Sequence, residues 1–196
     1  MLRSATAAGF GLTLVALLMA APVSANTITY QAFLAGTNEV PPNLSPATGF
    51  ATLTLDDVLH TLLVDETFSG LDGGPASAAH IHCCAPAGVN ATVAIGFPGF
   101  PAATSGTYSH TFILTDILIY NGAYVTAHGG NVAGAEAALL AALNNGNAYV
   151  NIHNATYPGG EIRGQIAATV PEPASLTLIG TGLAALVARR RRAQRR

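Results

Sequence analysis

Short apolar stretches alternate with turn-rich stretches through the middle of the chain, and this pattern predicts an all-β domain. In several stretches apolar residues recur at every second position, so that Leu62, Val64 and Phe68 share one face of a strand. The predicted strands cover residues 27–35, 49–56, 59–68, 77–82, 91–96, 107–115, 148–153 and 161–167.

One segment departs from the β pattern and predicts a short helix over 131–145. Leu139 and Leu143 stand at helical spacing, Asn131 is a candidate N-cap, and Gly146 is a candidate stop. The expected fold is therefore mostly β: a single antiparallel β-sandwich-like domain with one short helix.

The first 25 residues have the three parts of a secretory signal peptide. Arg3 supplies the positive start, an apolar run covers 10–21, and the small residues Val23 and Ala25 flank Ser24 before a cleavage site. We expect cleavage after Ala25, and the alternative is an uncleaved anchor helix.

The C-terminal end combines a short motif, an apolar segment and a basic cluster. The motif is Pro171-Glu172-Pro173, the apolar segment covers 174–188, and the cluster begins with Arg189, Arg190, Arg191 and Arg192. This segment of 15 residues would make a helix about 22 Å long, shorter than a hydrocarbon core of about 30 Å. The order resembles the PEP-CTERM sorting signal, which exosortase-type transpeptidases process in Gram-negative bacteria that make exopolysaccharide. A plain C-terminal anchor helix with cytoplasmic Arg residues is the alternative.

Charge is distributed unevenly along the chain, although the formal net charge is only −2. The chain has no Lys, and Arg163 is the only cation between residues 26 and 170. The same segment holds nine carboxylates, which gives it a formal charge of −8. Because nucleic-acid affinity depends on cations that neutralise phosphates, nucleic-acid binding is excluded as a function class.

Three histidines are candidate metal ligands. His80 and His82 alternate with Ile81 on a predicted strand and therefore point to the same side. His153 lies on a later predicted strand, on the face opposite its apolar residues. If the two strands are neighbours, the three imidazoles form a site with the ligand number of an open copper or zinc centre. The alternative is a set of hydrogen-bonded polar groups at a sheet edge.

Cys83 and Cys84 follow the histidine pair directly. Free thiols rarely persist in an oxidising exported compartment, so a vicinal disulfide is the first interpretation. Metal ligation together with His80 and His82, and bonds to other chains, remain open.

Arg163 is expected to form a structural ion pair, because it is the lone cation among nine carboxylates. Glu39 is one candidate partner, and Glu161 lies on the same strand face as Arg163. Binding of an external carboxylate or sugar acid by the guanidinium is the alternative.

The sequence contains no Gly-x-Ser-x-Gly elbow, no paired carboxylates and no phosphate-cradling glycine loop. The expected protein is therefore not an enzyme.

Four ordered motifs resemble the CHRD domain, the repeated module of chordin that also occurs in exported bacterial proteins. They contain Phe33-Leu34-Ala35-Gly36-Thr37-Asn38-Glu39-Val40-Pro41-Pro42, Ala79-His80-Ile81-His82, Tyr149-Val150-Asn151-Ile152-His153 and Gly159-Gly160-Glu161-Ile162-Arg163-Gly164-Gln165. The resemblance implies an extracellular β-sandwich-like module and supplies no chemistry. Cys83-Cys84 departs from the Gly-Pro found after the histidine pair in many members.

The expected organisation is a signal peptide over 1–25, a CHRD-like domain over 26–168 and a sorting signal over 169–196. The first functional hypothesis is a non-catalytic binding or structural module on the cell surface or in the extracellular matrix. Its expected partners are an exosortase-like enzyme, exopolysaccharide or envelope components, and the membrane at least transiently. The second hypothesis is an extracytoplasmic copper- or zinc-binding protein that uses His80, His82 and His153, with a redox role as one form of it.

Overall fold

The computed structural model describes residues 27–169. Nine antiparallel strands form one sheet in the order β5-β4-β7-β8-β1-β2-β3-β6, and the short β9 pairs with β1. The strands are β1 (Thr27–Ala35), β2 (Thr48–Asp56), β3 (Thr61–Ser69), β4 (Ala76–Cys83), β5 (Thr92–Gly96), β6 (Gly106–Ile113), β7 (Ala148–Asn154), β8 (Ile162–Gln165) and β9 (Ala167–Ala168). The predicted signal peptide with Ala25 and the sorting motif at 171–192 lie outside the described residues.

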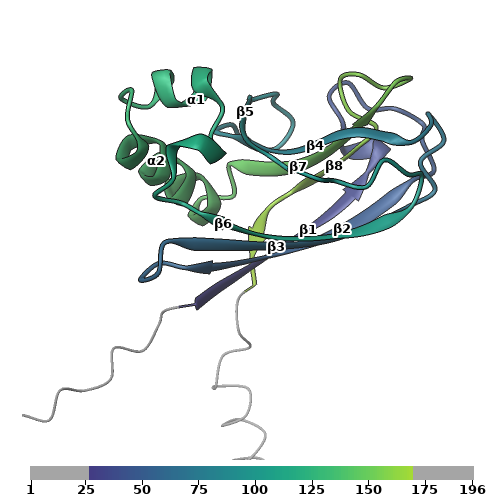
Figure 1. Ribbon diagram of the computed structural model, residues 1–196. Helices are drawn as coiled ribbons and strands as arrows, with labels where there is room; N and C mark the ends of the chain where they lie inside the picture. Colours follow the sequence, from purple (N-terminus) through teal and green to yellow (C-terminus); the bar gives the residue numbers. More distant parts are fainter. Residues whose placement is uncertain (1–26, 170–196) are drawn as a thin grey trace, which may run out of the picture.

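The sheet curls so that its two halves face each other. Figure 1 shows β4, β7 and β8 in one layer and β2, β3 and β6 in the other, with the helices at one end. The sandwich-like arrangement is thus produced by a single continuous sheet, and the expected mostly β antiparallel fold is confirmed.

Alternation along the strands builds the core between the two halves. On β3, Leu62, Val64 and Phe68 are buried, as the pattern of apolar residues predicts. Ile81 on β4 and Val150 on β7 are fully buried from the other half. The core therefore lies between the inner faces of the curled sheet.

The predicted helix is α2 (Val132–Asn144). The side chain of Asn131 accepts a hydrogen bond from the backbone N–H of Gly134, and Gly146 has a positive φ of 67° just after the helix. Leu139 and Leu143 are fully buried, which confirms the predicted apolar face.

Three shorter elements are not predicted by the sequence pattern. They are η1 (Gly36–Asn38), η2 (Ile117–Ile119) and α1 (Gly122–Ala127). The helix α1 has only six residues and starts with Gly, so no helical periodicity develops. Its position depends on tertiary contacts, because Tyr124 and Val125 are buried against the rest of the domain.

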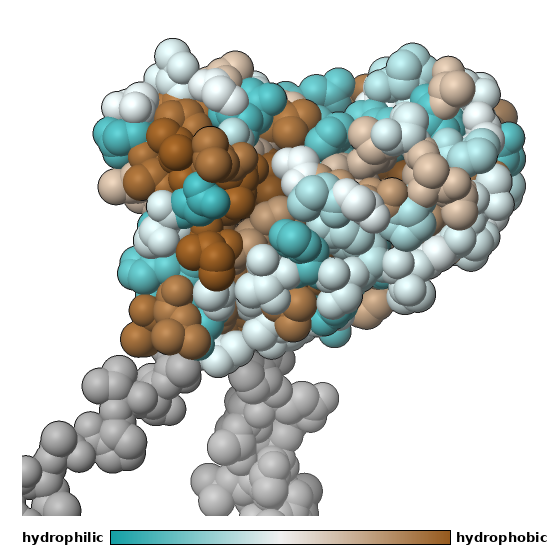
Figure 2. Space-filling view, in the orientation of Figure 1, coloured by the Kyte–Doolittle hydropathy of each residue, from teal (hydrophilic) through white to brown (hydrophobic). Residues whose placement is uncertain are grey.

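Exposed large apolar side chains gather mainly near the helical end of the domain. Figure 2 shows a broad apolar area on that side of the molecule. The exposed apolar side chains at this end include Val58, Leu59, Ile113, Ile117 and Leu118. Within residues 27–169, no helix is both long and apolar enough to cross a membrane.

Gly164 lies where β8 passes very close to β1, and its replacement by Ala is expected to destabilise the domain. An added Cβ would lie 2.7 Å from the carbonyl oxygen of Phe33 and 2.9 Å from its carbonyl carbon. Since both atoms belong to backbone, we expect Gly164→Ala to lower the free energy of unfolding by about 2–3 kcal/mol. Urea denaturation measures the difference.

Gly159→Ala is the matched control, because an added Cβ there meets no atom within 4 Å. The control is expected to stay within about 0.5 kcal/mol of the natural protein. Equal stabilities of the two variants would show that β8 can move away from β1 without cost.

Candidate metal centre

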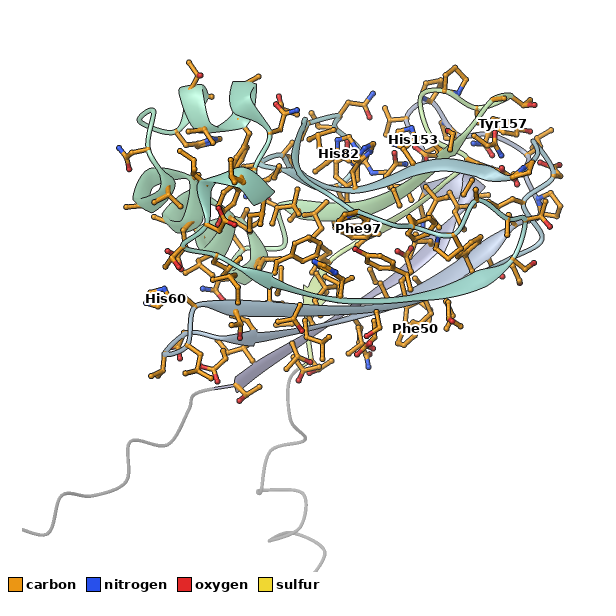
Figure 3. The ribbon with its side chains drawn as sticks, viewed as in Figure 1. Phe50, His60, His82, Phe97, His153 and Tyr157 are labelled. Carbon is orange, nitrogen blue, oxygen red and sulfur yellow. A yellow bond between two sulfur atoms is a disulfide. The ribbon has the colours of Figure 1, made fainter. Side chains whose placement is uncertain are left out.

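Neighbouring strands bring the three histidines together. β4 pairs with β7 so that His80 stands opposite Asn151, and His82 stands opposite Tyr149. The ring centroids of His80 and His153 are 4.9 Å apart, and those of His80 and His82 are 5.6 Å apart. Figure 3 shows His82 and His153 on one side of the β4–β7 layer and Phe97 on the other, between the halves of the sheet.

One ring nitrogen from each histidine points into the cluster. Candidate ligand atoms of His80, His82 and His153 all lie within 4.8 Å of one another. Metal–nitrogen bonds of about 2.0–2.1 Å would place such atoms about 3.4 Å apart around one tetrahedral ion. Among the described residues this is the only group of three or more His, Cys, Asp and Glu with such a geometry.

Backbone carbonyls fix the tautomers of two of the imidazoles. Nδ1 of His82 lies 2.9 Å from the carbonyl oxygen of Ala91, and Nδ1 of His153 lies 3.0 Å from that of Pro158. A carbonyl can only accept, so each Nδ1 carries the proton in the neutral ring. The lone pair of each ring is therefore on Nε2, which is buried and has no hydrogen-bond partner. This is how metal-binding histidines are commonly oriented.

The environment keeps the cluster uncharged. Burial lowers the pKa of His80 to about 4, with a further lowering by the neighbouring His153. Burial also lowers the pKa of His82 to about 4 and lowers the pKa of His153. At neutral pH the three rings are neutral, which is the state that binds a metal ion. Nδ1 of His80 is also buried without a partner, so the cluster contains three buried ring nitrogens that make no hydrogen bond.

His80 gives the cluster an open side. Its side chain is half-buried and lines a cleft of about 680 Å³ together with Val93 and Gly96 of β5. His82, in contrast, is only 8 % exposed.

His82 stacks on the ring of Tyr149, which in turn stacks on the guanidinium of Arg163. The rings of His82 and Tyr149 are parallel within 3°, with centroids 4.6 Å apart. The guanidinium carbon of Arg163 lies 3.5 Å from the centroid of the Tyr149 ring. The Tyr149 hydroxyl accepts a hydrogen bond from the N–H of Ala91, whose carbonyl oxygen accepts from His82. The stack therefore fixes both the plane of the imidazole and its hydrogen-bond partner.

The expected ion pair between Arg163 and Glu39 or Glu161 is wrong. Among residues 27–169, the one basic nitrogen within 4.0 Å of a carboxylate oxygen is that of His60, which lies next to Glu136. Arg163 instead donates to Oδ1 of Asn90 at 2.9 Å and to the carbonyl oxygen of Val89 at 2.7 Å. Neutral oxygens and the face of Tyr149 satisfy the guanidinium without a carboxylate.

Glu39 lies near Arg163 without touching it. Its Oε1 accepts a hydrogen bond of 2.5 Å from the side-chain amide of Asn151. Burial raises the pKa of Glu39 to about 7, although the positive charge of Arg163 and the hydrogen bond lower it in part. Glu39 thus covers the polar face of β7 beside the cluster.

Glu161 has a structural role that sequence analysis did not find. The carboxylate is fully buried and accepts hydrogen bonds from the Ser45 hydroxyl (2.6 Å), the Asp72 N–H (2.8 Å) and the Asn154 amide. These donors come from three separate loops or strand ends. The carboxylate ties them together, and nothing in the spacing of the residues indicates that they meet.

The two cysteines form a disulfide with each other, which was the first of the three interpretations. Cys83 is buried in the core, and its sulfur lies near Tyr124 and the carbonyl oxygen of Ala138. Successive strand residues point to opposite faces, so Cys83 faces away from His82. The sulfurs are not part of the histidine cluster.

Comparisons with known proteins identify two parts of the chain. The family model of the CHRD domain matches residues 30–166, and that of the PEP-CTERM protein-sorting motif matches residues 169–192. No curated protein and no solved structure matches the chain. The sorting motif implies processing by an exosortase-type system and export to the cell envelope or surface. The chain therefore belongs to the CHRD domain family and carries a PEP-CTERM sorting signal behind that domain.

Proposed function

We propose that this exosortase-sorted surface protein binds one copper or zinc ion through His80, His82 and His153. The observation that carries the proposal is the set of three buried ring nitrogens without hydrogen-bond partners, at His80 Nδ1, His82 Nε2 and His153 Nε2. Leaving such groups unpaired is costly, and one cation would satisfy all three.

The donor set favours copper over zinc. Three neutral imidazoles suit both ions, and in a given nitrogen site divalent copper binds more tightly than zinc. The acidic body of the protein adds a favourable field for any cation, because nine carboxylates stand against one Arg between residues 26 and 170.

The broader role in this proposal is non-catalytic. The domain would present or retain the metal ion outside the cell, as a binding module in contact with exopolysaccharide or other envelope components. The half-buried position of His80 beside a cleft supports access of a small ligand or a metal-donating molecule to the ion. The expectation that the chain is not an enzyme stays a prediction.

Metal analysis of the full chain, purified in a mild detergent, tests the proposal. After exposure to equal concentrations of copper and zinc followed by gel filtration, we expect one copper ion per chain. Electron paramagnetic resonance of the divalent copper form should show coupling to three nitrogen nuclei. Less than about one-fifth of a copper ion per chain, or a spectrum without nitrogen coupling, would contradict the proposal.

A further inference from the structure

The disulfide between Cys83 and Cys84 lies at the end of β4 and separates two different environments. Cys83 is 3 % exposed and belongs to the core, whereas Cys84 is exposed in the loop that follows. The two residues of the disulfide therefore differ in their access to solvent, and Cys84 is the exposed one.

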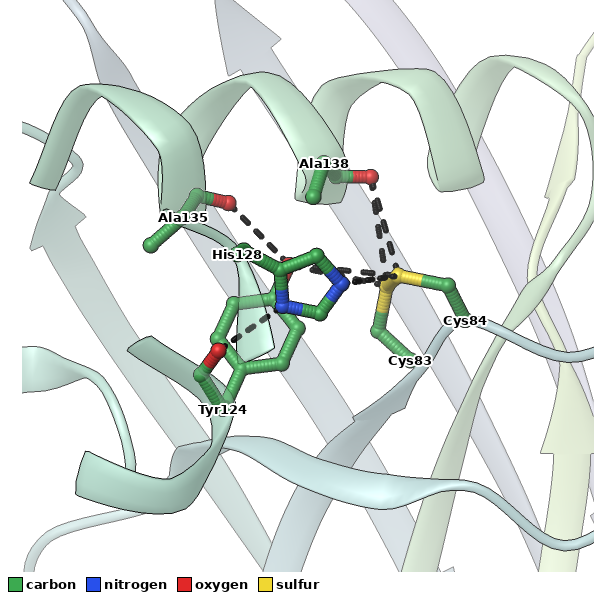
Figure 4. Close-up of a disulfide and its surroundings, with 6 residues drawn as sticks. All are labelled: Cys83, Cys84, Tyr124, His128, Ala135 and Ala138. Carbon is green, nitrogen blue, oxygen red and sulfur yellow. Dashed lines mark hydrogen bonds between the residues drawn. A yellow bond between two sulfur atoms is a disulfide. The ribbon is translucent and has the colours of Figure 1, made fainter. Parts of the chain in front are cut away.

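Polar groups of α1, α2 and the residue after α1 surround the sulfurs. Figure 4 shows them: the Tyr124 hydroxyl, the carbonyl oxygen of Ala138 and the imidazole of His128. The Ala138 oxygen lies 3.9 Å from Cys83 Sγ and 3.7 Å from Cys84 Sγ. Nε2 of His128 lies 4.0 Å from Cys84 Sγ, and the Tyr124 hydroxyl lies 3.6 Å from Cys83 Sγ.

The tautomer of His128 makes its Nε2 an acceptor. Nδ1 of this ring lies 2.8 Å from the carbonyl oxygen of Tyr124, which can only accept, so Nδ1 carries the proton in the neutral imidazole. The lone pair of Nε2 faces the exposed sulfur of Cys84.

Two hydrogen-bond acceptors thus face sulfurs that have no hydrogen. In the disulfide neither sulfur can donate, so the Ala138 oxygen and His128 Nε2 gain nothing from them. In the dithiol each S–H has an acceptor in place, while the Tyr124 hydroxyl donates its one hydrogen to the carbonyl oxygen of Ala135 at 3.0 Å. The surroundings therefore fit the reduced pair better than the oxidised pair.

We propose that Cys83–Cys84 is a redox-active disulfide that undergoes thiol–disulfide exchange with dithiols, with Cys84 as the attacked sulfur and His128 as the acceptor that stabilises the reduced form. A thiolate of the dithiol bonds to Cys84 Sγ, the Cys83–Cys84 bond breaks, and its electron pair leaves on Cys83 Sγ. The second thiol of the dithiol then closes the dithiol's own disulfide and releases Cys84. Two electrons and two protons pass to the protein, which gains two thiols.

Dithiothreitol is the probe, applied to the full chain in mild detergent with a chelator present, so that the result does not depend on metal binding. Alkylation followed by mass spectrometry counts the thiols without denaturant. We expect two new thiols per disulfide and, when glutathione replaces dithiothreitol, a mixed disulfide on Cys84 only. His128→Ala should lower the equilibrium constant for reduction about three- to tenfold, because one hydrogen bond to the reduced state is lost.

His60→Ala is the matched control, because it removes an exposed imidazole whose hydrogen-bond partner is Glu136 and not a sulfur. It should leave the equilibrium constant unchanged, as judged on samples with the same circular dichroism spectrum. A disulfide that dithiothreitol reduces only after unfolding, a glutathione adduct on Cys83, or equal equilibrium constants for His128→Ala and the natural chain would each overturn the proposal.

Discussion

Replacing His153 with Ala is expected to lower the affinity of the chain for copper more than a hundredfold. Loss of a group that merely orients a metal ligand typically costs 10–100-fold in affinity, and His153 is itself one of three proposed ligands. Its Nε2 is buried without a partner, and the carbonyl oxygen of Pro158 holds the ring in place. Two imidazoles on β4 cannot complete the coordination that three supply. Competition with a chelator of known affinity measures the change.

Thermal unfolding separates lost binding from lost folding. Copper should raise the melting temperature of the natural chain, because an ion bound only by the folded state stabilises it by mass action. That increase should be absent in His153→Ala, while the metal-free variant should still unfold cooperatively. His60→Ala loses the contact with Glu136, which lies outside the histidine cluster, so it should keep the natural copper affinity and the copper-dependent increase in melting temperature. An unchanged copper affinity in His153→Ala would place the ion elsewhere.

Replacing Glu66 with Gln is expected to stabilise the metal-free domain by about 3 kcal/mol at pH 7. Glu66 is 1 % exposed on β3, and neither of its carboxylate oxygens has a hydrogen-bond partner. Burial raises its pKa from 4.5 to about 8. The folded protein therefore holds the proton at pH 7 while the unfolded chain releases it, and the folded state is penalised. Gln resembles the protonated acid and avoids this penalty.

The effect has a defined dependence on pH. Because the folded pKa is higher than the unfolded pKa, the penalty is absent below about pH 4.5, grows up to about pH 8 and is constant above. Urea denaturation of both proteins between pH 4 and pH 8 should show the curves diverging with rising pH. Asp65→Asn, at the exposed neighbouring position of β3, should change stability by less than about 0.5 kcal/mol. A constant difference between Glu66→Gln and the natural protein across this range would contradict the expectation.

The local pattern predicted the strands well. Each predicted strand lies on an observed one, and the helix over 131–145 is α2. These elements are predictable because side-chain alternation and helix capping depend on neighbours in the chain. By the same rule His80 and His82 had to share one face, since strand geometry alone determines it. Glu66 is an exception to the rule that charged residues lie outside. It alternates in phase with Val64 and Phe68 and is therefore buried with them, although a carboxylate is expected on the exposed face.

The meeting of His153 with His80 and His82 could not be predicted from the sequence. It depends on the pairing of β4 with β7, which are far apart in the chain and have β5, β6 and both α-helices between them. The carbonyl oxygens of Ala91 and Pro158, which orient two of the rings, are backbone groups in loops. Any residue type offers such a carbonyl, so no sequence signal marks them.

Arg163 shows how a correct premise led to a wrong partner. A buried lone cation needs acceptors, and the sequence offers nine carboxylates between residues 26 and 170. The fold instead brings the loop with Val89 and Asn90 over the guanidinium, and neutral oxygens satisfy it. Which acceptor reaches a buried donor is determined by loop paths, and those depend on the whole domain.

Residue order along the chain is enough to specify the class of domain, the positions of its strands, the face shared by His80 and His82, and the sorting motif at the C-terminal end. All of these follow from short-range periodicity or from the order of residues in one segment. Three other features follow from the folded arrangement of the strands: the imidazoles converge, Arg163 stacks on Tyr149, and Cys83 points away from the histidines toward Tyr124. These contacts join residues that are distant in the chain, and they form because strand order and the curl of the sheet bring those residues together.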